Sequence, residues 1–261
     1  MKIDDAIKKI KYEKEIGLMG HIIAGYPDMK TSYEAALGIC EAGADFLEIQ
    51  FPFSDPFADG PTIEEACYKS IENGFTIEKG FELVKDVSSK AETSVLIMTY
   101  GNIIYKYGVE KFIKKAKESG AIGLIVPDIP LERDEDLNAL CGKHGIVNII
   151  LVTPGADAER IKFLSSKGKG FLYTVMRRGI TGKKTEMDVG LDEWITLVKE
   201  NSSLPIAAGF GIQSREQIEY LSGKVDIAII GSFFVKKIRE LFDNKADVKS
   251  EIKKTVSEIF G

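Results

Sequence analysis

The 261-residue sequence is poor in histidine: His21 and His144 are the only two. This scarcity argues against a histidine-based metal site or a Ser-His-Asp triad. The three cysteines are far apart without CxxC spacing, which indicates core residues in a reducing compartment rather than a zinc or redox motif. No apolar run approaches the roughly 20 residues of a membrane span, and the N-terminus lacks the apolar region of a signal peptide. We therefore expect a cytoplasmic protein without a metal site and with no membrane association.

The chain also lacks an excess of positive charge. It has 35 Lys and Arg against 40 Asp and Glu, a formal net charge of −5, and the two signs are interspersed. Such a surface is not typical of a nucleic-acid binder, and no GxGxxG or GxxxxGK[ST] motif indicates a nucleotide site. Any anionic ligand must therefore be held by local groups.

Short runs rich in β-branched and aromatic residues alternate with longer amphipathic stretches. The eight runs are 18–25, 44–51, 94–100, 122–129, 148–154, 170–176, 205–211 and 226–232. Near-continuously apolar strands are typical of a parallel sheet buried on both faces. Eight such strand–helix units fit an α/β fold of the (β/α)₈ TIM-barrel type better than an open doubly wound sheet, which is the alternative. We expect residues 1–261 to form one barrel domain.

Two helices are expected beyond this plan. Ile3, Ile7 and Ile10 form one stripe of an N-terminal helix that would cover the bottom of the barrel. After the second strand there is room for an extra helix near 62–73 before the regular helix near 76–90.

In this fold the active site lies at the C-terminal ends of the strands. Glu48 lies inside the second run and shares a strand face with Gln50. If that face points inward, the Glu48 carboxyl is a candidate general acid or base; an outward Glu paired with a helix cation is the alternative. In the following loop, Asp55 before a proline is best explained as a turn former. Asp59 before a glycine fits a turn or a functional role equally well.

The last two runs end in glycine-containing segments, GFG at 209–211 and GS at 231–232. Barrel enzymes bind phosphate at this place through backbone N–H groups and a short helix N-terminus, although each glycine alone could mark only a tight turn. After the sixth run, residues 176–190 form a long basic stretch without periodicity. It fits a lid over an anionic substrate, or a solvated loop without a catalytic part.

At this point the chain resembles one family nearly end to end, the tryptophan synthase α subunit, which cleaves indole-3-glycerol phosphate into indole and glyceraldehyde 3-phosphate. The segments that carry the resemblance are FPFSDPFADGPTI (51–63), MTYGN (98–102), VPDIP (126–130), RGITG (178–182), GFGI (209–212) and IIGS (229–232).

The resemblance implies a role for each matching residue. Glu48 resembles the general acid that protonates indole C3, and Asp59 the carboxylate that holds and deprotonates the indole N–H. Tyr173 resembles the tyrosine beside the catalytic acid, and Thr181 the lid threonine that meets the catalytic aspartate on closure. The other matching positions are Gly182, Gly211, Gly231 and Ser232 for phosphate binding, Tyr100 and His21 for the indole pocket, and Asn102 for the partner-facing surface.

The activity so implied is a retro-aldol cleavage by acid–base catalysis, with no cofactor in this chain. Indole would pass to a pyridoxal-phosphate β subunit in an αββα complex. Four positions depart from the family pattern. His21 stands where the family usually has an apolar residue, Gln50 replaces a glycine, Met176 a serine, and Tyr26 an aspartate.

Other functions remain open from the sequence. Indole-3-glycerol phosphate synthase would require lysines at strand ends and a phosphosugar epimerase a metal, and the inward positions identified offer neither. A regulatory subunit without cleavage activity is disfavoured because Glu48 and Asp59 are both present. A free-standing, indole-releasing lyase would differ from a coupled subunit in turning over well without the β subunit.

Overall fold

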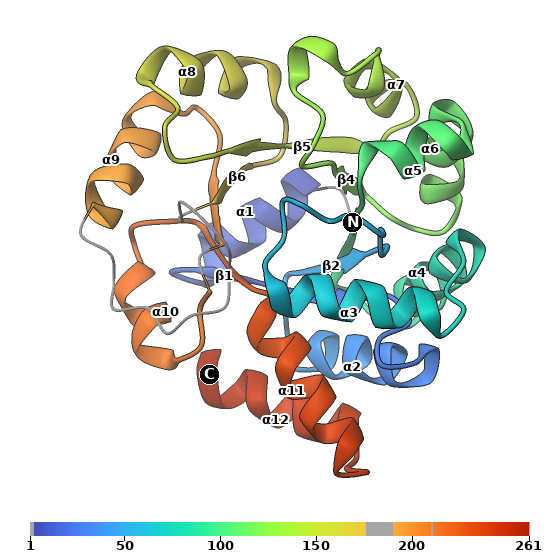
Figure 1. Cartoon of the computed structure of the whole chain (residues 1–261). Helices are drawn as coiled ribbons and strands as arrows, with labels where there is room; N and C mark the ends of the chain where they lie inside the picture. Colours follow the sequence, from blue (N-terminus) through green and yellow to red (C-terminus); the bar gives the residue numbers. More distant parts are fainter. Residues whose placement is uncertain (1–2, 176–189, 210, 261) are drawn as a thin grey trace.

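The computed structural model describes residues 3–175, 190–209 and 211–260. Within these ranges eight parallel strands close into a barrel in chain order, with β8 hydrogen-bonded to β1 (Figure 1). The strands are β1 (Gly17–Ile23), β2 (Phe46–Gln50), β3 (Ser94–Met98), β4 (Gly123–Ile125), β5 (Val147–Val152), β6 (Leu172–Val175), β7 (Ile206–Gly209) and β8 (Ile227–Ile230). Each lies within or beside one of the predicted runs, and the TIM-barrel prediction is confirmed.

Helices surround the barrel (Figure 1). They are α1 (Ile3–Glu13), α2 (Met29–Glu41), α3 (Pro61–Glu72), α4 (Ile77–Lys90), α5 (Gly101–Tyr107), α6 (Val109–Glu118), α7 (Leu137–Lys143), α8 (Ala158–Lys167), α9 (Leu191–Asn201), α10 (Arg215–Leu221), α11 (Ser232–Asp243) and α12 (Val248–Phe260), with a 3₁₀ turn at Leu131–Arg133. Side-chain N-caps fix several of their starts: Asp28, Thr76 and Asp157 each accept a hydrogen bond from the backbone N–H three residues later. Along the part of the chain described, no helix is long and apolar enough to cross a membrane.

The predicted extra helices are α1 and α3, and the structure adds two that the sequence pattern did not predict. The short helix α5 is separated from α6 at Gly108, whose φ of +96° favours glycine. At the other end of the chain, α12 packs against α2 (Figure 1). The helix after β8, α11, is a full 12 residues rather than the short helix expected.

The two ends of the barrel differ in chemistry. At the N-terminal end, Ile3, Ile7 and Ile10 of α1 pack in one buried cluster with Phe46 and Phe171, whose rings meet edge to face at 5.4 Å. In Figure 1, α1 accordingly lies across the far side of the barrel. Because this end is closed by apolar packing, polar groups inside the barrel are left to the opposite end, where the strands finish.

Candidate active site

A cavity of about 400 Å³ lies at the C-terminal ends of the strands. Apolar side chains such as Met98, Ile125 and Leu151 form much of its wall. Seven of the residues singled out from the sequence also line it: His21, Glu48, Asp59, Tyr173, Gly211, Gly231 and Ser232. The barrel therefore brings together groups that lie more than 200 positions apart in the chain.

Glu48 faces inward, which resolves the choice that the sequence left open. Its side chain is 2% exposed, and its Oε1 lies 3.0 Å from Nδ1 of His21 on the neighbouring strand. Burial alone would lower the pKa of His21, but the charge of Glu48, their hydrogen bond and the charge of Asp59 raise the pKa above its ordinary value. The contact between Glu48 and His21 therefore favours a protonated His21 in the wall of the cavity.

Asp59 is held by uncharged donors. Nε2 of Gln50 donates to its Oδ2 at 2.7 Å, and the hydroxyl of Tyr100 donates to the same oxygen at 2.9 Å. Burial raises the pKa of Asp59, while the bond from Gln50, the charge of His21 and the bond from Tyr100 oppose the rise. Since both donors use Oδ2, the Oδ1 atom receives no hydrogen bond from the described residues and can accept one from a ligand.

The indole-pocket role of Tyr100 stays a prediction. Its side chain is fully buried and is not among the residues that line the cavity. Its hydroxyl accepts a hydrogen bond from the backbone N–H of Ala58 and donates to Asp59, and its ring stacks on Phe53 with centroids 5.2 Å apart. These contacts place Tyr100 behind Asp59, where it supports the carboxylate.

Tyr173 reaches the cavity from β6, across the barrel from β2. Burial, followed by the charges of Glu48 and Asp59, raises the pKa of Tyr173 well above its ordinary value. The hydroxyl therefore remains a proton-bearing donor near both carboxylates. A Cβ at Gly209 on the adjacent strand would lie 3.3 Å from the Tyr173 ring, so this glycine makes room for it.

Two of the predicted phosphate-binding glycines, Gly211 and Gly231, also line this cavity. Gly211 has φ +79°, and Gly231 is the N-cap of α11, whose first residue, Ser232, is 7% exposed. The free N–H groups and positive dipole end of this 12-residue helix suit an anion such as phosphate. The predicted Thr181 and Gly182 lie outside the described residues.

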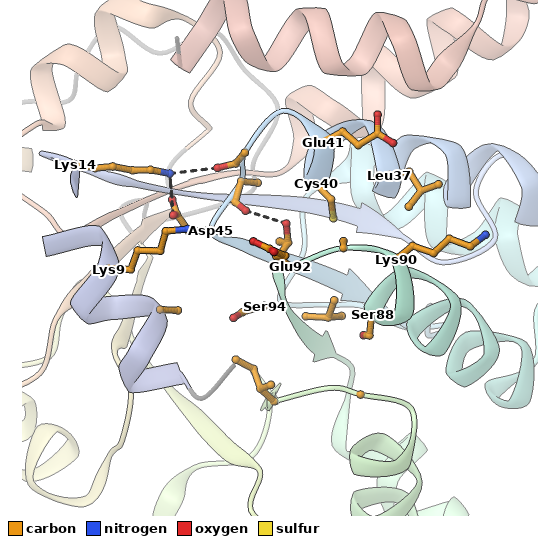
Figure 2. A pocket seen from close by; sticks show the side chains of 18 of the residues that line it. Lys9, Lys14, Leu37, Cys40, Glu41, Asp45, Ser88, Lys90, Glu92 and Ser94 are labelled. Atoms are coloured by element: carbon orange, nitrogen blue, oxygen red, sulfur yellow. Dashed lines mark hydrogen bonds and ion pairs between the residues drawn. The ribbon is translucent and has the colours of Figure 1, made fainter. Parts of the chain in front are cut away.

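A larger cavity of about 710 Å³ lies at the N-terminal ends of the strands (Figure 2). Four of its charged groups, Lys14, Glu41, Asp45 and Lys90, have partners of their own. Lys14 bonds both carboxylate oxygens of Asp45, as drawn in Figure 2, while Glu41 pairs with Lys249 and Lys90 donates to Tyr33. These groups do not converge on a ligand, so the cavity at the C-terminal ends is the candidate active site.

The arrangement of this site can be compared with known proteins. The family model described as tryptophan synthase alpha chain matches residues 7–259. The chain belongs to the tryptophan synthase alpha chain family. The tryptophan synthase alpha chain of Helicobacter hepaticus is 52% identical over 230 residues, which cover 86% of each chain. That of a Thermoanaerobacter species is 36% identical over 258 residues, 99% of this chain and 98% of the relative.

Solved structures of tryptophan synthase share the fold over nearly the whole chain. A chain of Mycobacterium tuberculosis tryptophan synthase matches with a TM-score of 0.87 at 28% identity, covering 98% of both chains. A mutant tryptophan synthase alpha-subunit from Pyrococcus furiosus matches with a TM-score of 0.86 at 30% identity, covering 94% of this chain and 98% of that one. The match to the tryptophan synthase alpha chain family takes in every site residue predicted from the sequence.

Asn102, predicted to face the partner, is exposed in the first turn of α5. One contact escaped the sequence-based prediction. The sequence placed Gln50 on the face of Glu48 and marked it as a departure from the family, but did not predict that its amide bonds Asp59. The alternation along β2 already put Gln50 on the face of Glu48, but nothing in the sequence shows that the loop after β2 folds back onto it.

Proposed function

We propose that this chain is the α subunit of a tryptophan synthase and catalyses the retro-aldol cleavage of indole-3-glycerol phosphate to indole and glyceraldehyde 3-phosphate. One observation carries the proposal. Glu48 and Asp59 line the same cavity as Gly231 and Ser232 at the N-terminus of α11. A bound phosphate at α11 would leave the indole ring of this substrate beside the two carboxylates.

The two carboxylates have distinct tasks. Asp59 accepts the indole N–H through Oδ1 and stabilises the positive charge that develops when the ring is protonated. Glu48 gives a proton to C3, and the bond from C3 to the side chain then breaks with its electron pair returning to the ring. The hydroxyl on the departing carbon loses its proton and becomes the aldehyde. Since one proton is given and one is taken back, acid–base groups suffice for the cleavage.

The phosphate end of the site involves backbone rather than lysine. Gly182, Gly211, Gly231 and Ser232 are the proposed phosphate-binding positions, and Thr181 is proposed to meet Asp59 when the lid closes. The early N–H groups of α11 support the assignment of Gly231 and Ser232. This mode explains how a chain of net charge −5 binds an anionic substrate.

We further propose a partner. Family membership supports a tryptophan synthase β subunit that carries pyridoxal phosphate, with Asn102 on the contact surface and an αββα assembly. No cofactor is assigned to this chain. The three free cysteines in the described ranges are buried, which supports a reducing, cytoplasmic location.

The test is steady-state cleavage of indole-3-glycerol phosphate by the purified chain, with and without a tryptophan synthase β subunit. Slow cleavage that rises strongly with β is the expected result. Rapid cleavage without β would point to a free-standing lyase, and no cleavage in either condition would refute the proposed activity.

A further inference from the structure

Two ionisable side chains meet in the cavity wall. β1 and β2 are neighbours in the barrel (Figure 1), and their register sets His21 directly opposite Glu48. Nδ1 of His21 lies 3.0 Å from Oε1 of Glu48, and the two side chains are only 5% and 2% exposed. The histidine at this position is thus in direct contact with the proposed catalytic acid.

Each of these groups uses only one of its two polar atoms. Nε2 of His21 and Oε2 of Glu48 are buried without a hydrogen-bond partner among the described residues. Leaving a buried polar atom unpaired is costly, so such atoms at a cavity wall are expected to serve a ligand. When Nδ1 carries a proton it donates to Oε1, which leaves Oε2 as the oxygen that can deliver a proton.

The surroundings act on this pair from several elements. Negative charge comes from Glu48 on β2 and Asp59 in the loop after β2, and it raises the pKa of His21 although burial, the largest effect, opposes this. Tyr173 on β6 keeps its proton and stays neutral, and its hydroxyl lies close enough to Glu48 to interact with it. From α11, Gly231 approaches the imidazole, with a Cβ position 3.7 Å from its ring, and the positive helix end there disfavours an imidazolium.

We infer that His21 is a positioning residue that acts through Glu48: it fixes Oε1 by a hydrogen bond and shares one proton with the carboxyl group. This inference rests on the proposed lyase activity. In the shared state the pair carries one proton on either Nε2 or Oε2, in addition to the proton on Nδ1. Glu48 gives this proton to indole C3 and recovers one from the substrate hydroxyl, so the pair ends with the proton count with which it began.

The raised pKa of His21 therefore keeps the shared proton on the pair as the pH rises. Two variants separate the hydrogen bond from the titration. His21→Phe keeps a ring of similar size but removes the donor. His21→Asn keeps a donor near the Nδ1 position but cannot titrate. His144→Asn, at a histidine that instead contacts Glu110 far from the cavity, is the matched control.

The first measurement is kcat and KM for indole-3-glycerol phosphate against pH, for each variant with a β subunit present. His21→Phe should lower kcat by about ten- to a hundredfold with KM changed by less than about threefold, because a misplaced acid loses rate rather than binding. Its alkaline limb should move to lower pH. At pH values below the alkaline limb, His21→Asn should recover most of the kcat that His21→Phe loses. Its alkaline limb should remain at the lower pH. His144→Asn should match the unmodified chain.

The second measurement does not depend on activity. With two histidines in the chain, His144→Asn identifies the NMR signals of His21, whose titration can then be followed with and without Glu48→Gln. The pKa of His21 should fall when the carboxylate is removed. This readout also serves if His21→Phe does not fold.

The outcomes are decisive in both directions. A His21→Phe variant with unchanged kcat and an unchanged alkaline limb overturns the inference, as does one that alters KM alone, since a wall residue would do that. An unshifted His21 titration in the Glu48→Gln protein also overturns it. Absence of cleavage by the unmodified chain, with the His21 titration still tied to Glu48, would instead refute the proposed function.

Discussion

Two neutral donors, Gln50 and Tyr100, stabilise the ionised form of Asp59. The substitution Tyr100→Phe tests this dependence most directly. The substitution deletes one oxygen that bonds both Asp59 and the backbone N–H of Ala58. The ring keeps its stacking partner Phe53 and its buried position. Since Ala58 is exposed, water can replace the lost acceptor, and we expect a fall in unfolding free energy of only about 1 kcal/mol.

The effect on Asp59 is larger than the effect on stability. A hydrogen bond to a carboxylate contributes about 1.5–3 kcal/mol and one to a neutral group about 0.5–1.5 kcal/mol. Removing the donor therefore disfavours the ionised form by roughly 1.4 kcal/mol, which corresponds to about one pH unit. Because burial already raises the pKa of Asp59, the loss of Tyr100 should raise it further.

The assay is the pH dependence of kcat/KM for indole-3-glycerol phosphate. Asp59 must be ionised to accept the indole N–H, so activity is lost as pH falls through its pKa. In Tyr100→Phe this acid limb should move up by about one unit, and in Gln50→Leu it should move in the same direction because both donors use Oδ2. Tyr33→Phe, which removes an exposed hydroxyl bound to Lys90, should leave the limb in place. An acid limb at the same pH in Tyr100→Phe, Gln50→Leu and the unmodified chain would refute the reasoning.

Three further outcomes follow from the structure. Glu48→Gln should lower kcat by at least about a hundredfold while substrate still binds, measured by turnover and calorimetry. Gly231→Ala should raise KM more than Ser232→Ala without changing the melting temperature, because its Cβ meets no atom closer than 3.7 Å but enters the proposed phosphate cradle. Hydrogen bonds, first from His144, lower the pKa of Glu110 to about 2. The stabilisation of the fold by ionised Glu110 is thus complete above about pH 4.5 and is lost as the pH falls through about 2. In the Glu110→Gln variant the melting temperature should therefore depend less on pH in that range.

The barrel could be predicted from the sequence because its signals are local. The run 94–100 contains β3 at 94–98, and the two further residues, Thr99 and Tyr100, lead from the strand into α5, whose N-cap is Tyr100. The alternation of strands and helices predicts one helix after each strand. It gives no signal for α12, which follows α11 directly and packs against α2 from the start of the chain.

The direction of Glu48 could not be settled from its own strand. Alternation shows that Glu48 and Gln50 share one face, but it does not show which face points inward. That depends on closure of the barrel, which puts Phe46 of the same face against Phe171 of the opposite side. The surroundings of Tyr100 also depend on residues far away in the sequence, since the loop after β2 contacts it through Ala58.

Two of the positions that depart from the family pattern prove to be partners of the two proposed catalytic carboxylates. His21 contacts Glu48 from the adjacent strand, and Gln50 contacts Asp59 from the same strand as Glu48. Each departure makes a hydrogen bond to one carboxylate only, so the main effects of changes at His21 and Gln50 should fall on opposite limbs of the pH profile. The two effects should be nearly additive, apart from the coupling that the charges of His21 and Glu48 impose on Asp59. Strong non-additivity would mean that His21, Glu48 and Asp59 titrate as one coupled cluster.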